Sequence, residues 1–443
     1  MLLFPALIAE KILLSLYLVF LPITFRFLAK AISTKGTYIQ YFVFPFTYSY
    51  LFYYGFYNFH LGMIFLFLTI GLWLKYSQSY QINVKHFSIL VLLSLLIYFS
   101  HLFVYVIFLA VVSLLTIFKV FTQPFSKVNI LNSLKKPLIL FAPGVILMII
   151  YLYTHKTIPE DYSNLANYSQ SWFSIQNIEP AKGVEYGTEG IFTKWIFILF
   201  VIIVCNLLII RIKNFKAAVN QKSIIWGIIS AGLLISFFVF PNGSTFIRPR
   251  LLVFFFLFFI LFITTQKVNV WVRVISFVVI NYMSAGLLVV YIESASDTNN
   301  ITHDIIEASE HIEPFSTVLP INDSDFWLMA HSSNYLGINK PMVILENYEA
   351  STNYFPLIWN RNKLPFLHLG ETDQTQVNYP HNKNNFKSQI DYVLVISNIN
   401  TPKKKGKNEK EINELLEKYY ELTYITDSHS VKLYRKTPAF EGV

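Results

Sequence analysis

The sequence predicts a polytopic α-helical membrane protein with a C-terminal extracytoplasmic α/β domain, and three observations support this fold class. Of the 443 residues, 54% are hydrophobic and only 14% are charged, whereas soluble domains are about 45–50% apolar and about 25% charged. Acidic residues are absent between Glu10 and Glu160 and again between Glu189 and Glu293. After Glu293 the composition becomes that of a soluble domain. We therefore expect a transmembrane domain over residues 1–292 and a soluble α/β domain over 293–443.

Ten apolar segments predict about ten membrane helices, some of them short. A single helix over 86–121 would be about 54 Å long, well beyond a hydrocarbon core of about 30 Å. We therefore expect a break at Ser100 and His101. The segments lie at 12–28, 39–57, 59–74, 87–99, 101–118, 137–153, 195–210, 224–240, 251–265 and 271–292.

The charges of the connecting loops predict the orientation. Loops 119–136 and 211–223 each carry four basic residues and no acidic residue, whereas loop 154–194 carries five acidic residues and three lysines. Because cytoplasmic loops are enriched in Lys and Arg, the two basic loops are expected inside. The same path places 29–38, 75–86 and 266–270 inside. It places 1–10, 55–60, 100–101, 154–194, 241–250 and everything after 293 outside.

Charge and cysteine content exclude several classes of function. The net charge of +9 divides into +15 for residues 1–292, from 21 basic and six acidic residues, and −6 for 293–443, from 14 and 20. Most basic residues lie in short loops, which indicates membrane topology, so no nucleic-acid partner is expected. The single cysteine, Cys205, excludes an intramolecular disulfide and metal sites built from paired cysteines. The histidines after residue 293 show no metal-ligand spacing, and no cofactor fingerprint is present, so neither a metal nor a cofactor is expected.

Five polar residues near the predicted outer helix ends are candidates for a site: Asn58, His60, His101, Arg248 and Arg250. Ionisable residues inside a membrane are costly and usually functional. A structural interpretation is also open for each, because Gly55, Asn58 and Gly62 are typical of a bend and His101 is suited to cap a helix. If they form a site, His60, His101 and Arg248 are expected to meet at one outward-opening cavity.

The stretch "PNGSTFIRPR" places Arg248 and Arg250 on either side of Pro249. Arginine binds phosphate through two parallel hydrogen bonds, and a lipid phosphate is the natural partner at the outer membrane surface. The alternative is that both arginines extend to ordinary phospholipid headgroups.

The region after Glu293 alternates helices and strands, which indicates a small α/β domain. Helices are expected at 303–312, 324–337 and 409–421. Strands are expected at 316–321, 340–348, 391–397, 422–427 and 430–436. The aromatic stretch "ENYEASTNYFPLIWN" (346–360) either contacts sugars or docks the domain onto the membrane part.

The order of parts resembles bacterial membrane proteins of the GT-C glycosyltransferase architecture. The stretches that carry the resemblance are "FPFTYSYLFYYGFYNFHLG", "LLIYFSHLFVYVIFLA", "FIRPRLLVFFFLFFILF" and "VILENYEASTNYFPLIWN". The resemblance implies a protein of the bacterial cytoplasmic membrane that transfers a sugar from a polyprenyl-phosphate donor at the outer face, in contact with membrane lipids.

The chemistry of such a transfer suggests roles for the candidate residues by their position. Arg248 and Arg250 would bind the lipid phosphate, Glu10, His60 or His101 would be the catalytic base, and Asn58 would support them. The usual base of the family lies in a first extracytoplasmic loop, and this sequence has only Glu10 near that position. Either an upstream segment or a partner chain supplies that loop, or this chain is not active in that way. The alternative function is a non-catalytic assembly or transport component for cell-envelope polysaccharide, with intramembrane polar residues across the full bilayer depth.

Overall fold

The computed structural model forms two compact units, Ile8–Tyr291 and Met1–Leu7 with Ile292–Val443. We call them the helical unit and the C-terminal unit and describe each by itself. The structure describes residues 4–33, 37–77, 83–122, 127–154, 168–184, 186–214, 220–241, 246–324, 326–346, 358–360, 390–397 and 409–437.

Among the described residues, eight helices are long and apolar enough to cross a membrane, which supports a membrane protein. They are α1 (Ala6–Ile32), α3 (Tyr57–Tyr76), α5 (Leu102–Thr122), α6 (Lys127–Thr154), α8 (Tyr186–Lys213), α9 (Gln221–Val239), α10 (Ile247–Thr264) and α11 (Val270–Ser309). A ninth apolar helix, α4 (Val84–Ser100), has 17 residues. The predicted break is confirmed, since α4 ends at Ser100 and α5 begins at Leu102.

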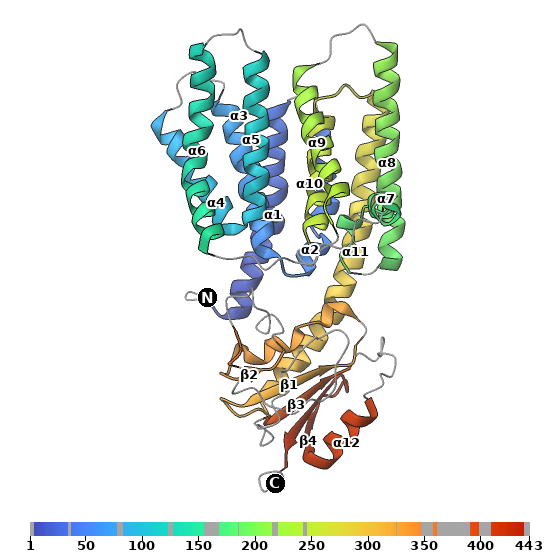
Figure 1. Ribbon diagram of the computed structural model, residues 1–443. Coiled ribbons are helices and arrows are strands. Elements are labelled where there is room, and N and C mark those ends of the chain that lie inside the picture. The colour runs from blue at the N-terminus through green and yellow to red at the C-terminus, as the bar shows by residue number, and fades with distance from the viewer. Residues whose placement is uncertain are drawn as a thin grey trace. The chain divides into compact units, whose positions relative to one another are not determined.

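Helix α10 lies at the centre of the helical unit. Most of its side chains are buried, as expected for a helix that is apolar on all sides. It packs against α9 and against η1 (Thr37–Phe46). Helix α3 packs on α4 and α5, and both of these pack on α6 (Figure 1). Helix α1 approaches α3 closely, because a Cβ atom at Gly71 would lie 2.6 Å from the Phe27 ring.

The predicted helix over 39–57 is wrong. Residues Thr37–Phe46 form the 3₁₀ helix η1, with Pro45 inside it, and the short helix α2 (Tyr50–Tyr53) follows. Ten residues of 3₁₀ helix extend about 20 Å, at about 2.0 Å per residue. The segment is largely buried against its neighbours. Non-α backbone is tolerated at membrane depth where protein surrounds it, and the buried position of η1 meets this condition.

Several helices extend beyond their apolar runs. Helix α6 begins at Lys127, α8 begins at Tyr186, and α11 continues to Ser309. The helix expected at 303–312 is therefore the end of α11. Charged and polar residues such as Lys and Glu are good helix formers, so a helix does not have to end where its apolar run ends. Loop 154–194 contains two further elements, α7 (Tyr168–Gln176) and η2 (Glu179–Ala181).

The described part of the C-terminal unit forms a five-stranded sheet of order β2-β1-β3-β5-β4. Strand β1 pairs in parallel with β2 and β3, while β5 pairs antiparallel with β3 and β4. Leu319 of β1 is opposite Val393 of β3, and Leu394 is opposite Leu433 of β5. The bounds are β1 (Thr317–Asn322), β2 (Val343–Ile344), β3 (Tyr392–Ile396), β4 (Tyr420–Ile425) and β5 (Val431–Lys436), with α12 (Glu409–Tyr419) before β4.

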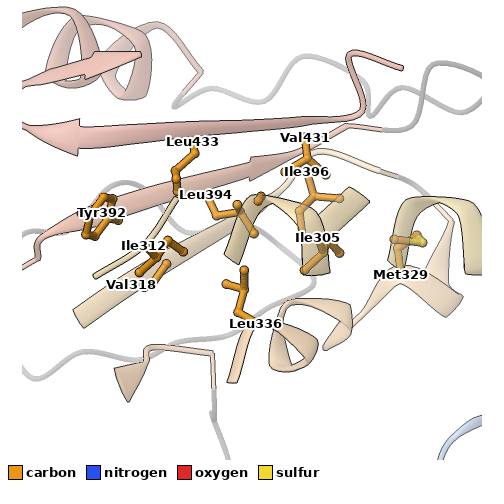
Figure 2. Packing of buried hydrophobic residues seen from close by; sticks show 11 residues of the cluster. Ile305, Ile312, Val318, Met329, Leu336, Tyr392, Leu394, Ile396, Val431 and Leu433 are labelled. Carbon is orange, nitrogen blue, oxygen red and sulfur yellow. The ribbon is translucent and has the colours of Figure 1, made fainter. Parts of the chain in front are cut away.

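Alternate residues of the strands form cores on the two faces of the sheet. On one face, Leu394 and Leu433 pack with Ile305 from the end of α11 (Figure 2). On the other face, Val393 packs with Leu416 of α12. The end of α11 is therefore part of the core of this unit.

Two predicted elements of the C-terminal unit differ from the structure. The helix expected at 324–337 consists of two 3₁₀ segments, η3 (Trp327–Met329) and η4 (Ser332–Ile338). The strand expected at 340–348 is only two residues long in β2, since its pairing with β1 ends at Ile344. Most of the aromatic stretch at 346–360 lies outside the described residues.

Candidate functional site

The predicted site residues lie at one end of the helical unit. The beginnings of α3 and α10 meet there, because the Phe246 ring lies 5.2 Å from the rings of both Tyr54 and Phe56. Gly55, with a φ of +79°, provides the left-handed backbone that turns the chain from α2 into α3. Aromatic packing thus brings the bend at residues 54–56 and the beginning of α10 to one end of the bundle.

His60 is fully buried, and both of its ring nitrogens have partners. Nδ1 donates to the Phe56 carbonyl oxygen at 2.8 Å, since a carbonyl can only accept. In the neutral ring Nε2 then accepts the Ser49 hydroxyl at 2.9 Å. The Tyr17 ring stands edge-on at 4.8 Å. This geometry ties the bend at Gly55 to α3.

Asn58 and His101 lie at helix termini. Asn58 is exposed, and its Oδ1 accepts the Phe59 amide. His101 ends α4, and its Nδ1 accepts the Phe103 amide at 3.2 Å at the beginning of α5. The Phe59 ring lies between the two histidines, 5.3 Å from His60 and 5.5 Å from His101. His60 and His101 are therefore close, with an aromatic ring separating them.

Glu10 lies near the beginning of α1 and is half-buried. It interacts electrostatically with Tyr57, the first residue of α3. The carboxylate thus lies near the beginning of the helix that carries His60.

The two arginines have different surroundings. They lie two positions apart on α10, and side chains at that spacing do not share a helix face. Arg250 lies over the rings of Phe56 and Phe59, at 4.6 and 5.6 Å from their centroids. It also interacts electrostatically with His60 and His101. Arg250 therefore belongs to the aromatic group around the histidines.

Arg248 is held in a different place by three contacts. Its Nε donates to the Phe237 carbonyl oxygen at 3.1 Å, and a terminal guanidinium nitrogen donates to the Ser171 hydroxyl of α7. Its Cζ lies 4.8 Å from the centre of the Phe237 ring. These contacts join α7, α9 and α10 and leave the guanidinium with a defined orientation.

Arg248 lines a cavity of about 170 Å³, which we call the Arg248 cavity. The polar residues around it are Tyr50, Gln170, Ser174, Glu179 and Arg248. The apolar residues around it are Leu51, Pro180, Phe237, Phe246, Pro249, Leu252 and Val253. Convergent polar groups beside apolar residues are typical of a small-molecule site. Neither His60, His101 nor Arg250 lines this cavity, so His60 and Arg248 do not share it.

Glu179 is a cavity residue that the sequence analysis did not single out. It begins η2 and interacts electrostatically with Arg248. Its segment is held by Glu189, whose Oε1 accepts the amides of Gly183 and Val184. The Tyr291 hydroxyl also donates to the Ala181 carbonyl oxygen at 2.6 Å. One buried acceptor, the Glu189 carboxylate, and one buried donor, the Tyr291 hydroxyl, thus hold the turn that follows Glu179.

Lys182 is the second cation of this region and is buried. Burial lowers the pKa of Lys182, and Glu179 and Glu189 act in the opposite direction. A Cβ atom at Gly183 would lie 2.5 Å from the Tyr53 ring, so glycine is required for the close packing of this turn. The signal in the sequence was the run "EPAKG", where Pro180 follows Glu179 at the beginning of a helical turn.

A second group of ionisable residues lies in the C-terminal unit. Ligand atoms of His303, Asp304 and Glu307 lie within 4.8 Å of one another. Asp304 accepts hydrogen bonds from Ser428 and Ser430. Glu307 accepts the Tyr424 hydroxyl at 2.7 Å, which raises the pKa of Tyr424 to about 12. These contacts connect α11 to the β4–β5 hairpin, which is a structural role.

The Arg248 cavity combines a fixed cation, a carboxylate and an apolar lining. A guanidinium in this position can bind a phosphate group, and the apolar wall can hold the first carbons of a lipid chain. Comparison with known proteins adds no assignment, because no protein-family model and no curated protein matches the chain.

Proposed function

We propose that this chain is a GT-C-like glycosyltransferase of the bacterial cytoplasmic membrane, and that the Arg248 cavity binds the phosphate of its polyprenyl-phosphate-linked sugar donor. The observation that carries the proposal is the fixed guanidinium of Arg248 in a cavity lined by both polar and apolar residues. A lipid with an anionic headgroup requires a cation for the headgroup and apolar residues for the chain in one site.

The chemistry of sugar transfer explains why a fixed cation is useful. When the bond between the sugar and the phosphate breaks, negative charge develops on the phosphate oxygen. A prearranged donor stabilises that charge without reorganising during the reaction. Arg248 is such a donor, because Phe237 and Ser171 hold it in place.

The proposal narrows the roles of the other candidates. Arg250 lies over Phe56 and Phe59 and stabilises the aromatic group of the bend. His60 has both ring nitrogens engaged, so it positions the bend. Glu10 and His101, both half-buried, are the candidates for the base that takes the acceptor proton.

The orientation belongs to the same proposal. Loop 154–194 carries Glu179 and is acidic, whereas loops 119–136 and 211–223 are basic. Basic loops stay in the cytoplasm. The acidic loop, and with it the Arg248 cavity and the C-terminal unit, would then lie on the outer side. A polyprenyl-linked donor would enter the cavity from the outer leaflet.

Binding of polyprenyl monophosphate to the full chain in lipid nanodiscs, measured by native mass spectrometry, tests the proposal. The wild-type chain should bind it in preference to a polyprenol of the same length that lacks the phosphate. Arg248→Gln should weaken binding by about tenfold or more, since hydrogen bonds to a charged group contribute about 1.5–3 kcal/mol. Arg273→Gln is the matched control, because Arg273 is exposed and lies near Tyr38 instead of the cavity. Failure of the wild-type chain to bind, or equal loss in both variants, would contradict the proposal.

A further inference from the structure

The carboxylate of Glu179 is an unexpected component of a phosphate site. It lines the same cavity as Arg248 and interacts with it electrostatically. Like charges at close range repel one another, and a carboxylate near a bound phosphate reduces the affinity for it. The position of Glu179 is also defined, since Glu189 and Tyr291 hold the turn that carries it. A site for a bare phosphate would not place a carboxylate there.

The two lipid forms of a transfer reaction differ in charge. A sugar-linked phosphate is a diester with one negative charge. A phosphate monoester carries a charge of about −1.5 to −2 at pH 7, because its second pKa is about 6. A carboxylate therefore repels the monoester more strongly than the diester. It can also accept hydrogen bonds from sugar hydroxyls, which a monoester lacks.

The cations and carboxylates in and beside the cavity sum to zero, so the region has no excess positive charge for a ligand with two negative charges. Arg248 and Lys182 are the cations, and Glu179 and Glu189 are the carboxylates that interact with them. The carboxylate of Glu189 accepts two backbone amides and is committed to the turn. Glu179 is thus the carboxylate whose effect reaches the ligand.

We infer that Glu179 is a specificity-determining residue, which makes the Arg248 cavity select a lipid phosphodiester over the corresponding monoester. This inference rests on the proposed function, since it identifies the diester as the sugar-loaded donor and the monoester as the spent lipid. In that reaction the new charge on the spent lipid arises beside Glu179, and repulsion promotes its release.

The test compares two probes with the same lipid chain, polyprenyl monophosphate and its methyl phosphodiester, at pH 8 in nanodiscs that contain the full chain. The wild-type chain should bind the diester about tenfold more tightly, a factor within the range of one like-charge interaction near a protein surface. Glu179→Gln should reduce this preference to about threefold or less, mainly by tighter binding of the monoester.

A second variant keeps the test independent of folding defects. Gln170 lines the same cavity, so Gln170→Glu adds a carboxylate and should increase the preference for the diester. A folding defect would instead weaken both probes together. An unchanged ratio in Glu179→Gln, or a shift in the same direction in both variants, would overturn the inference while leaving the proposed function intact. Absence of binding of either probe to the wild-type chain would contradict the proposed function itself.

Discussion

The Ser49 hydroxyl lies 2.9 Å from Nε2 of His60, and Nδ1 of the same ring lies 2.8 Å from the Phe56 carbonyl oxygen. One imidazole therefore connects the beginning of α2, the bend at Gly55 and the first turn of α3. The amide of Phe52 also donates to the Ser49 hydroxyl, so the network caps α2. His60, a candidate base in the sequence, connects α2, the bend and α3 in this structure.

Replacing His60 by Ala should lower the stability of the helical unit without removing a ligand contact. The loss should be about 1–3 kcal/mol, because the Ser49 hydroxyl and the Phe56 carbonyl would lose a buried partner. Thermal unfolding in detergent is the measurement. Asn58→Ala is the matched control, since Asn58 lies on the same helical turn and is exposed. A variant that keeps its stability but loses polyprenyl monophosphate binding would show that His60 belongs to the site.

Replacing Glu189 by Gln should loosen the turn that carries Glu179. The charged acceptor of two backbone amides becomes a neutral one, which weakens hydrogen bonds by roughly half. Hydrogen exchange of residues 179–184 in the full chain should become faster. Exchange in α5 should not change, because α5 does not contribute to this turn. Equal acceleration throughout the helical unit would indicate global destabilisation and contradict the specific role of Glu189.

The burial of Glu346 predicts that the stability of the C-terminal unit depends on pH. It is 3% exposed, its Oε1 accepts the His331 amide, and its Oε2 is buried without a hydrogen-bond partner in the described part of the chain. Burial raises the pKa of Glu346 from 4.5 to about 7, although the His331 amide acts in the opposite direction. Between these values the folded state keeps a proton that the unfolded state releases. The free energy of unfolding should therefore fall as the pH rises through this window, by up to about 3 kcal/mol.

Glu346→Gln removes the charge and should abolish this dependence. Hydrogen exchange of β1 and β3 in the full chain, compared between wild type and variant at each pH, is the measurement. The variant should be the more protected protein at pH 8, and the difference should disappear at pH 5. Glu421→Gln, at an exposed position, is the control. A difference that is the same at both pH values would show that Glu346 does not titrate as described.

The orientation predicts which positions react with a membrane-impermeant thiol reagent in intact cells. With Cys205 replaced by Ser, new cysteines at Gln176 and Glu421 should be labelled from outside. New cysteines at Lys213 and Gln221 should react only after the membrane is permeabilised. All four positions are exposed. Labelling of Gln221 but not of Gln176 in intact cells would invert the proposed orientation.

The sequence predicted the parts of the fold that depend on composition and periodicity. Long uncharged runs gave most helices, and the length argument located the break at His101. The prediction of an α-helix over residues 39–57 was wrong, because an apolar run does not distinguish an α-helix from a buried 3₁₀ segment such as η1. The predicted end of α11 was too early. Polar residues after Tyr291 continue this helix, and its last turns pack in the core of the C-terminal unit.

The candidate site was predicted only in part. Clustering of His60, His101 and Arg250 at one end of the bundle follows from the topology. Arg248 and Arg250 face different neighbours because α10 begins at Ile247, which places both residues in the helix. The sequence does not show where this helix begins. Glu179 could not be assigned, because its role depends on long-range contacts of the turn that Glu189 and Tyr291 hold.

Photo-cross-linking tests most directly whether the Arg248 cavity is the lipid-phosphate site. A polyprenyl monophosphate that carries a diazirine on the carbons next to the phosphate would be activated in nanodiscs that contain the full chain, and adducts would be located by peptide mass spectrometry. The account predicts adducts in α7 and η2 (168–181) and at the beginning of α10 (246–253), lost with excess unlabelled lipid and in Arg248→Gln. Adducts that concentrate at the beginning of α9 or in the C-terminal unit, or that unlabelled lipid does not displace, would contradict it.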